Sequence, residues 1–236
     1  MLRNNQGRTR KARLVFLLLM LASGGLVVLS MVAQSLPDWD ADSDSASSTT
    51  NIISFLYGLV LLSYYACIAA SYVVLIMWLR RAYYNLHQLP NIRPEFSEGW
   101  AAGAWFVPFL NLIRPYTIMR EVWQDTQKAA WGRIVEPATI LGWWWAAFII
   151  KMIISRITSK MGSSGNGITQ DDLVAFMLDA GAQFVAAGLT WHIIGRASVF
   201  EEELTVRQQV GQLGQPIALP VSHKADQSDY ALEEGY

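Results

Sequence analysis

Two charged residues, Lys151 and Asp179, lie inside apolar stretches of the sequence. A charge near the middle of a membrane helix costs about 2.5–3.5 kcal/mol on insertion scales, so such residues usually face other helices and pair. Lys151 precedes the end of its stretch by about six residues and Asp179 follows the start of the next by about six, so both lie about 9–10 Å deep at 1.5 Å per residue. The spacing predicts an intramembrane ion pair between antiparallel helices. The pair can fix helix register or serve a proton or ion relay, and a Lys151 that reaches back to the interface is a third reading.

A second polar group, Asn111 and Arg114, lies in an apolar stretch with a proline on each side. Burying such groups without partners costs a few kcal/mol each, so we expect them to bond to backbone freed by the prolines, to Asn85 or to a ligand. Two arginines, Arg114 and Arg120, favour the head group of an anionic lipid as that ligand. A loop whose polar groups satisfy one another is the alternative.

The sequence contains few residues that could form another catalytic site or a cofactor site. The three histidines do not group into a Ser-His-Asp set or a pair of haem ligands, and the single Cys67 excludes an internal disulfide and a cysteine-based zinc site. The sequence shows no Gly-rich phosphate loop and no metal-ligand spacing. The net charge of −1 offers nucleic acid no overall attraction. We therefore expect no cofactor, no metal, no nucleic-acid partner and no enzymatic activity.

The elements that must position these residues are four apolar blocks of membrane-spanning length. Of the 236 residues, 53% are hydrophobic and 16% are charged, and the hydrophobic residues are gathered in blocks. A bilayer core of about 30 Å needs about 20 helical residues. The predicted helices span about 14–34, 52–79, 138–157 and 173–195. For the first block a cleaved signal peptide is the alternative, but its apolar core would be only about 7–15 residues long.

Between the second and third blocks, the stretch 94–123 is apolar but broken by proline. Pro108 interrupts one helix, and Pro115 is placed to begin another whose apolar residues recur with a helical period. A broken backbone at membrane depth is tolerated only where protein or a wet cavity covers it. We predict a re-entrant or interfacial helical element over 94–128. The alternative is a fifth crossing helix at 98–119, but its apolar run of about 15 residues is short for a bilayer.

The distribution of Lys and Arg predicts the orientation in the membrane. Five lie in the basic arm 1–13, seven in 80–133 and three from Arg196 onward, whereas Arg156 and Lys160 alone border the opposite side. Cytoplasmic loops carry the excess of Lys and Arg in membrane proteins. Both termini and the central element are therefore predicted to be cytoplasmic.

Two segments, WLRRAYYNL at 78–86 and GWAAGAWFVPFLNLIRPYTIMREVW at 99–123, resemble a known family. Their order of tryptophan, arginine-alanine and asparagine, then tryptophan, proline, asparagine and proline, is similar to the bacterial membrane family called domain of unknown function 4328. The matching residues are Trp78, Arg81, Ala82, Asn85, Trp105, Pro108, Asn111, Arg114 and Pro115. The resemblance covers about residues 50–200. It implies a multi-pass bacterial membrane protein and supplies no activity, substrate or catalytic residue.

Together these patterns predict an all-α integral membrane protein with four transmembrane helices and N-in/C-in termini in the bacterial cytoplasmic membrane. Residues 14–200 form its membrane domain, and the polar tail 201–236 is largely disordered. We expect a non-enzymatic scaffold or a partner- or lipid-binding subunit that presents 94–123 at the cytoplasmic interface. Its partners are the bilayer and an anionic lipid or a membrane protein, with room for a homo-oligomer. The alternative is a small transporter, or an ion or proton conduit, that uses Lys151 and Asp179.

Overall fold

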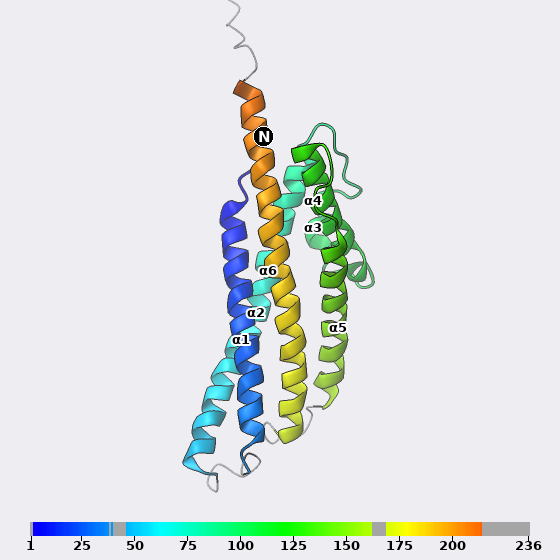
Figure 1. Ribbon diagram of the computed structural model, residues 1–236. Coiled ribbons are helices and arrows are strands. Elements are labelled where there is room, and N and C mark those ends of the chain that lie inside the picture. Colours follow the sequence, from blue (N-terminus) through cyan, green and yellow to red (C-terminus); the bar gives the residue numbers. More distant parts are fainter. Residues whose placement is uncertain (1, 38, 40–45, 162–168, 214–236) are drawn as a thin grey trace, which may run out of the picture.

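The computed structural model describes residues 2–37, 39, 46–161 and 169–213, and this part of the chain is all-helical. The elements in chain order are α1 (Gln6–Gln34), α2 (Ser48–His87), α3 (Trp100–Gly103), the 3-10 helix η1 (Leu110–Leu112), α4 (Arg114–Trp131), α5 (Thr139–Met161) and α6 (Gln170–Leu213). Figure 1 shows an elongated bundle of long helices, with α3 and α4 beside the upper part of α5.

Four helices of the described residues, α1, α2, α5 and α6, are long and apolar enough to cross a membrane. The predicted all-α fold with four such helices is confirmed. A bilayer core needs about 20 helical residues, whereas α2 has 40 and α6 has 44. Both helices therefore extend well beyond the length that a membrane requires.

Helix α6 does not end where its apolar pattern ends. From residue 201 we expected a short helix at most and then disorder; residues 201–213 continue the helix, and 214–236 lie outside the described residues. Packing supports this continuation, because Phe200, just before it, meets the rings of Trp123 and Trp131 edge-on at 4.9 Å and 5.6 Å, and Leu204 within it is buried. Helix α4 thus covers the start of this extension, and tertiary contacts stabilise a helix that its own hydropathy does not predict.

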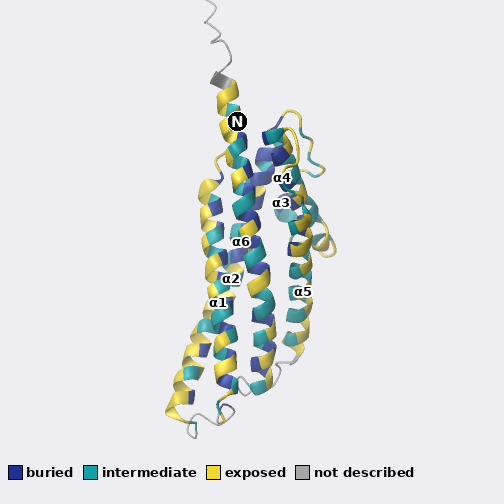
Figure 2. Ribbon diagram, in the orientation of Figure 1, coloured by how far each residue is buried: buried dark blue, intermediate teal, exposed yellow. Residues whose placement is uncertain are grey.

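The central helix of the bundle is α6. It packs against α1 and α5 and, at one end, against α4, while α1 also packs against α2. In Figure 2 the buried residues lie where the helices face one another and the exposed residues lie on the outer sides. The bundle interior therefore follows the length of α6.

Hydrogen bonds between buried side chains join these helices. Trp78 Nε1 donates to Thr9 Oγ1 at 3.1 Å and links α2 to α1. Trp144 Nε1 donates to Thr190 Oγ1 at 2.9 Å and links α5 to α6. Side-chain hydrogen bonds across membrane helices contribute about 0.6–2 kcal/mol each. They also fix the register of the helices that they connect.

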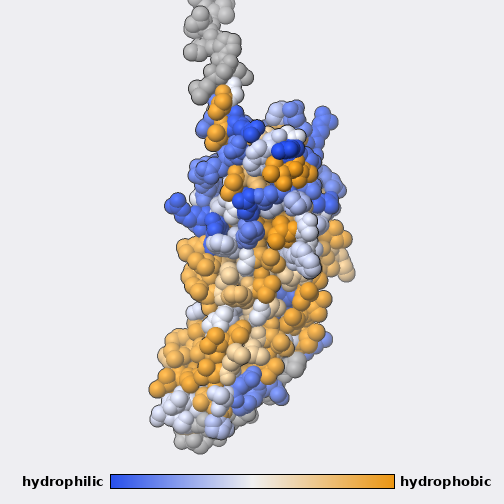
Figure 3. Space-filling view, in the orientation of Figure 1, coloured by the Kyte–Doolittle hydropathy of each residue, from blue (hydrophilic) through white to orange (hydrophobic). Residues whose placement is uncertain are grey.

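The outer surface carries many large apolar side chains. Leu21, Leu62 and Trp143 are 65%, 70% and 68% exposed. In Figure 3 hydrophobic residues form a broad band over the middle and lower part of the molecule, and hydrophilic residues gather at the end where α6 projects. Soluble monomers rarely expose apolar patches larger than a few hundred Å². The band is the kind of surface that a membrane protein turns toward lipid.

Candidate functional site

The segment between α3 and α4 lies alongside α5. Trp145 Nε1 donates to Leu112 O at 3.0 Å, and the rings of Trp105 and Phe148 meet edge-on with centroids 5.9 Å apart. Because α5 begins at Thr139, Phe148 lies about 13 Å along that helix at 1.5 Å per residue. The segment therefore reaches almost halfway along α5 instead of ending level with its first turn.

Short local turns satisfy much of the backbone of this segment. The N–H groups of Trp105, Phe106, Asn111 and Ile113 donate to carbonyls three or four residues earlier, at 3.0–3.3 Å. Phe109, at the bend, has a φ of 64°, a conformation that costs a non-glycine residue about 1–3 kcal/mol. Its side chain is 83% exposed. An irregular backbone that satisfies itself locally meets the main requirement for lying at membrane depth.

A pocket of about 260 Å³ lies between this segment, α2 and α5. Its lining residues are Tyr72, Trp105, Asn111, Phe148, Lys151, Met152, Ser155 and Arg156. We call it the Trp105–Lys151 pocket. It contains two cationic side chains and no acidic one. Trp105 Nε1 is buried and has no acceptor among the described residues. The lining therefore combines positive charge with a buried donor that lacks an acceptor, which suits a group with acceptor oxygens.

The predicted ion pair between Lys151 and Asp179 is not formed in the described part of the chain. Asp179 Oδ2 instead accepts a hydrogen bond from the hydroxyl of Tyr64 at 2.7 Å, and its Oδ1 has no partner. Both charges lie about 14–15 Å from the ends of α5 and α6 that face each other in sequence, at 1.5 Å per residue. Their depths agree, but Lys151 lines the pocket beside Tyr72 while Asp179 bonds to another part of α2.

The guanidinium of Arg114 lies against two aromatic rings. Its Cζ is 3.8 Å from the ring centroid of Trp100 and 5.0 Å from that of Phe96, and its Nη1 is buried without an acceptor. Such cation–π contacts contribute about 0.5–2 kcal/mol. Asn85, one of the three partners considered for Asn111 and Arg114, exchanges two hydrogen bonds of 2.9 Å with the backbone of Arg3. Of those alternatives, a bond between Asn85 and Arg114 is therefore not formed, and each residue has contacts of its own.

The other motif residues lie in several parts of the bundle. Trp78 and Ala82 are buried in α2, and Pro115 is buried in the first turn of α4. Pro108 is exposed at the bend, and Arg81 is half-buried. Only the tryptophan and the asparagine of the central segment line the pocket. The motif therefore combines packing residues with two pocket residues.

Sequence reasoning does not single out Gln127, although its fully buried side chain organises the turn before α5. Its Oε1 accepts from the N–H groups of Val135 and Glu136 at 2.9 Å and 2.7 Å. Its Nε2 donates to the carbonyls of Trp123 and Glu136 at 3.0 Å and 3.1 Å. The Glu136 carboxylate in turn pairs with Arg196 of α6. A glutamine on a helix carries no local signal for such a role.

A further carboxyl group on α4 is held between elements. Glu121 Oε2 accepts a hydrogen bond of 2.7 Å from the hydroxyl of Tyr83. Burial raises the pKa of Glu121 above its ordinary value, and the bond from Tyr83 opposes that rise only in part. The charged form is therefore less stable here than in water.

Comparison with known proteins gives one family match. The sequence model described as Domain of unknown function (DUF4328) matches residues 40–197. No curated protein and no solved structure matches the chain. The matched range includes α2, the central segment, α4, α5 and most of the apolar part of α6. It therefore contains the whole lining of the Trp105–Lys151 pocket.

Proposed function

We propose that this chain, which belongs to the Domain of unknown function (DUF4328) family, is a non-enzymatic membrane protein. In this proposal it binds the head group of an anionic phospholipid in the Trp105–Lys151 pocket. The observation that carries the proposal is the buried Trp105 Nε1–H, which has no acceptor among the described residues. A buried donor left without an acceptor costs about 1–3 kcal/mol. A phosphate oxygen in the pocket would accept this hydrogen bond.

The charge of the pocket supports an anion. Lys151 and Arg156 form no ion pair with any described residue. Cationic side chains at membrane depth usually pair with an opposite charge. A phosphodiester would provide that charge, and the amide of Asn111 and the hydroxyl of Ser155 are further donors in the lining.

The surface next to the pocket supports an amphiphile over a free anion. Phe106, Phe109 and Ile113 belong to the same segment as the pocket residues and are 75%, 83% and 65% exposed. Acyl chains of a lipid would cover these side chains while the head group enters the pocket. Small-molecule pockets commonly measure about 300–1,000 Å³, so a pocket of about 260 Å³ suits a head group better than a whole lipid.

The segment is, in this proposal, re-entrant, and both termini are cytoplasmic. The excess of Lys and Arg in the arm 1–13 and in 80–133 supports that orientation. Phe148 then lies about 13 Å below the cytoplasmic end of α5, and Arg156 lies about 8 Å from its other end. The segment enters the bilayer instead of resting at its surface. The bound phospholipid then belongs to the outer leaflet of a bacterial cytoplasmic membrane.

The test measures lipid binding to the delipidated protein in detergent by native mass spectrometry, with short-chain phosphatidylglycerol or phosphatidylcholine added. Trp105→Phe removes the N–H and keeps a ring, and Lys151→Met removes the charge and keeps the chain length. A hydrogen bond to a charged group contributes about 1.5–3 kcal/mol, so each variant should weaken phosphatidylglycerol binding about tenfold or more. Trp143→Phe and Lys160→Met are matched controls, because neither residue lines the pocket.

The outcomes distinguish a lipid site from a site for a free anion and from the absence of a site. Wild-type protein should retain phosphatidylglycerol in preference to phosphatidylcholine, and the two controls should behave like wild type. Equal binding by all variants would overturn the proposal. Displacement of phosphatidylglycerol by inorganic phosphate at similar concentration would identify the ligand as a free anion, because the acyl chains would then contribute nothing.

The alternative of an ion or proton conduit has less support. Lys151 and Asp179 do not pair in the described structure. The cavity that Lys151 shares with Gln183 and Thr190 measures about 30 Å³, which is about the volume of one water molecule. A cavity of this size favours packing over transport.

A further inference from the structure

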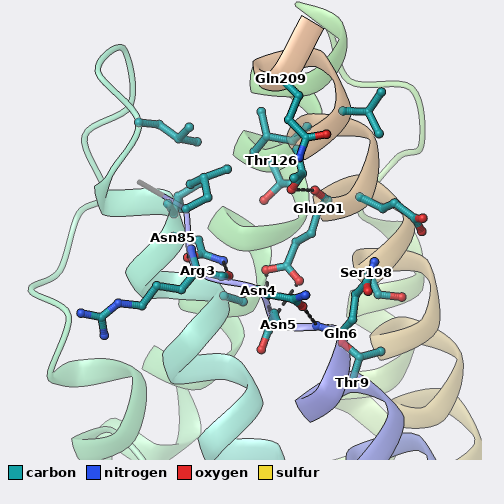
Figure 4. A pocket seen from close by; sticks show the side chains of 18 residues that line it. Arg3, Asn4, Asn5, Gln6, Thr9, Asn85, Thr126, Ser198, Glu201 and Gln209 are labelled. Atoms are coloured by element: carbon teal, nitrogen blue, oxygen red, sulfur yellow. Dashed lines mark hydrogen bonds between the residues drawn. The ribbon is translucent and has the colours of Figure 1, made fainter. Parts of the chain in front are cut away.

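A second cavity, of about 450 Å³, lies where the N-terminal arm meets the ends of the long helices. It shares no lining residue with the Trp105–Lys151 pocket. The arm residues 2–6 form one wall, the last turns of α2 form a second, and α4 and the extension of α6 close the remainder. Figure 4 shows Asn5 and Glu201 facing each other inside this cavity, with Arg3 and Asn85 beside them. We call it the Asn5–Glu201 cavity.

Hydrogen bonds over long sequence separations hold the arm in place. Asn85 exchanges two bonds with the backbone of Arg3, both 2.9 Å long. The amide Nδ2 of Asn5 donates to Glu201 Oε1 at 3.2 Å and to Oε2 at 3.1 Å. The arm is thereby attached to both α2 and α6, so the cavity is a defined part of the fold.

One acceptor in this cavity has nothing to accept. Asn5 is only 4% exposed, yet its Oδ1 has no hydrogen-bond partner. An asparagine at the position before a helix usually accepts a hydrogen bond from an N–H of the first turn. Asn5 precedes α1, but its side chain makes no such bond. Its buried oxygen is therefore free to bind a donor that the described residues do not provide.

The charge of the lining points to the kind of donor. Glu201 and Glu202 are its acidic residues and Arg3 is its cation. The guanidinium of Arg3 lies over the ring of Tyr84, with Cζ 4.1 Å from the centroid. No ion pair joins Glu201 to a cation in the described part of the chain. A half-buried carboxylate without a positive partner favours a cationic ligand.

We propose that the Asn5–Glu201 cavity binds a primary amine with an apolar body. An ammonium group has three donors and no acceptor, which suits the carboxylate of Glu201 together with Asn5 Oδ1. The buried side chains of Leu86, Leu89 and Leu204 in the lining receive the apolar part. The cavity volume lies within the usual range of about 300–1,000 Å³ for small-molecule sites. This site is independent of the lipid pocket, and failure of either proposal leaves the other standing.

The experiment uses the full chain in detergent, with 2-phenylethylamine as the probe and 2-phenylethanol as its uncharged analogue. Isothermal titration calorimetry of the wild-type protein should show saturable binding of the amine, at least tenfold tighter than that of the alcohol. This comparison requires no variant. Equal binding of both compounds would overturn the proposal. Uptake that does not saturate, as expected for partition into the micelle, would overturn it as well.

Two variants then locate the site. Glu201→Gln keeps the shape and an acceptor oxygen but removes the charge, and it should weaken amine binding tenfold or more. Glu203→Gln removes the same charge two residues later, from a side chain that pairs with Arg207 outside the cavity, and it should leave binding unchanged. Thermal unfolding confirms that both variants are folded. Loss of binding in Glu203→Gln but not in Glu201→Gln contradicts the assignment.

Discussion

Removing the hydroxyl of Tyr64 takes away the hydrogen bond that Asp179 accepts at 2.7 Å inside the bundle. A hydrogen bond to a charged group contributes about 1.5–3 kcal/mol, whereas bonds between membrane helices measured by double-mutant cycles average about 0.6 and reach about 1.7 kcal/mol. We expect a coupling free energy between Tyr64 and Asp179 of about 1–2 kcal/mol, which lies where the upper part of the membrane values meets the lower part of the charged-group values. Because Asp179 Oδ1 already lacks a partner, Tyr64→Phe leaves the whole buried carboxyl group unpaired.

The assay is reversible unfolding in mixed micelles for a double-mutant cycle of Tyr64→Phe with Asp179→Asn. A second cycle combines Lys151→Met with Asp179→Asn. Since Lys151 lies in the Trp105–Lys151 pocket and not against Asp179, the second coupling should be close to zero. Tyr65→Phe is the matched control, because Tyr65 is 51% exposed and donates no hydrogen bond to Asp179. A larger coupling for Lys151 than for Tyr64 refutes the assignment and restores the ion pair.

Two further predictions concern α4. Gln127→Leu should lower the unfolding free energy by about 2–4 kcal/mol, because it leaves several buried backbone groups of the following turn unpaired. Gln124→Leu, on the same helix, should change the unfolding free energy far less. Equal effects of the two substitutions would contradict the role of Gln127 in holding this turn. Glu121→Gln tests the raised pKa of Glu121. The stability that protonation gives is fully present below the ordinary value of 4.5 and is lost as pH rises through the raised pKa of the folded state. The melting temperature of Glu121→Gln relative to wild type should therefore increase with pH, and a difference that is constant with pH argues against the shift.

The positions along the helices could be predicted from sequence far better than the directions around them. The bilayer thickness sets a length that four apolar blocks meet, so the number of spanning helices follows from hydropathy. The common depth of Lys151 and Asp179 follows from the same rise per residue. Their partners depend on rotation about the helix axes, which a third helix and the central segment determine. Neither Tyr64 nor Trp105 is near them in sequence, so no local pattern carries that information.

Contacts at the projecting end of the bundle were also beyond sequence reasoning. Asn5 and Glu201 are separated by 196 positions, and Arg3 and Asn85 by 82. Each of these residues is of a polar type that is common on solvated protein surfaces. Helix α6 continues past residue 201 because α4 and the arm pack against it. From its sequence alone, a polar segment of this kind is predicted to be a disordered tail.

The central segment combines an irregular backbone with a firm attachment to α5. Its N–H groups are largely used by local turns, and Trp145 satisfies the carbonyl of Leu112. A non-helical backbone at membrane depth needs hydrogen-bond partners within the protein, because water cannot serve as a partner there. Against that background the unpaired donors Trp105 Nε1 and Arg114 Nη1 are exceptions. Arg114 already contacts the rings of Trp100 and Phe96, so Trp105 remains the donor of this segment that most clearly requires a partner beyond the described residues.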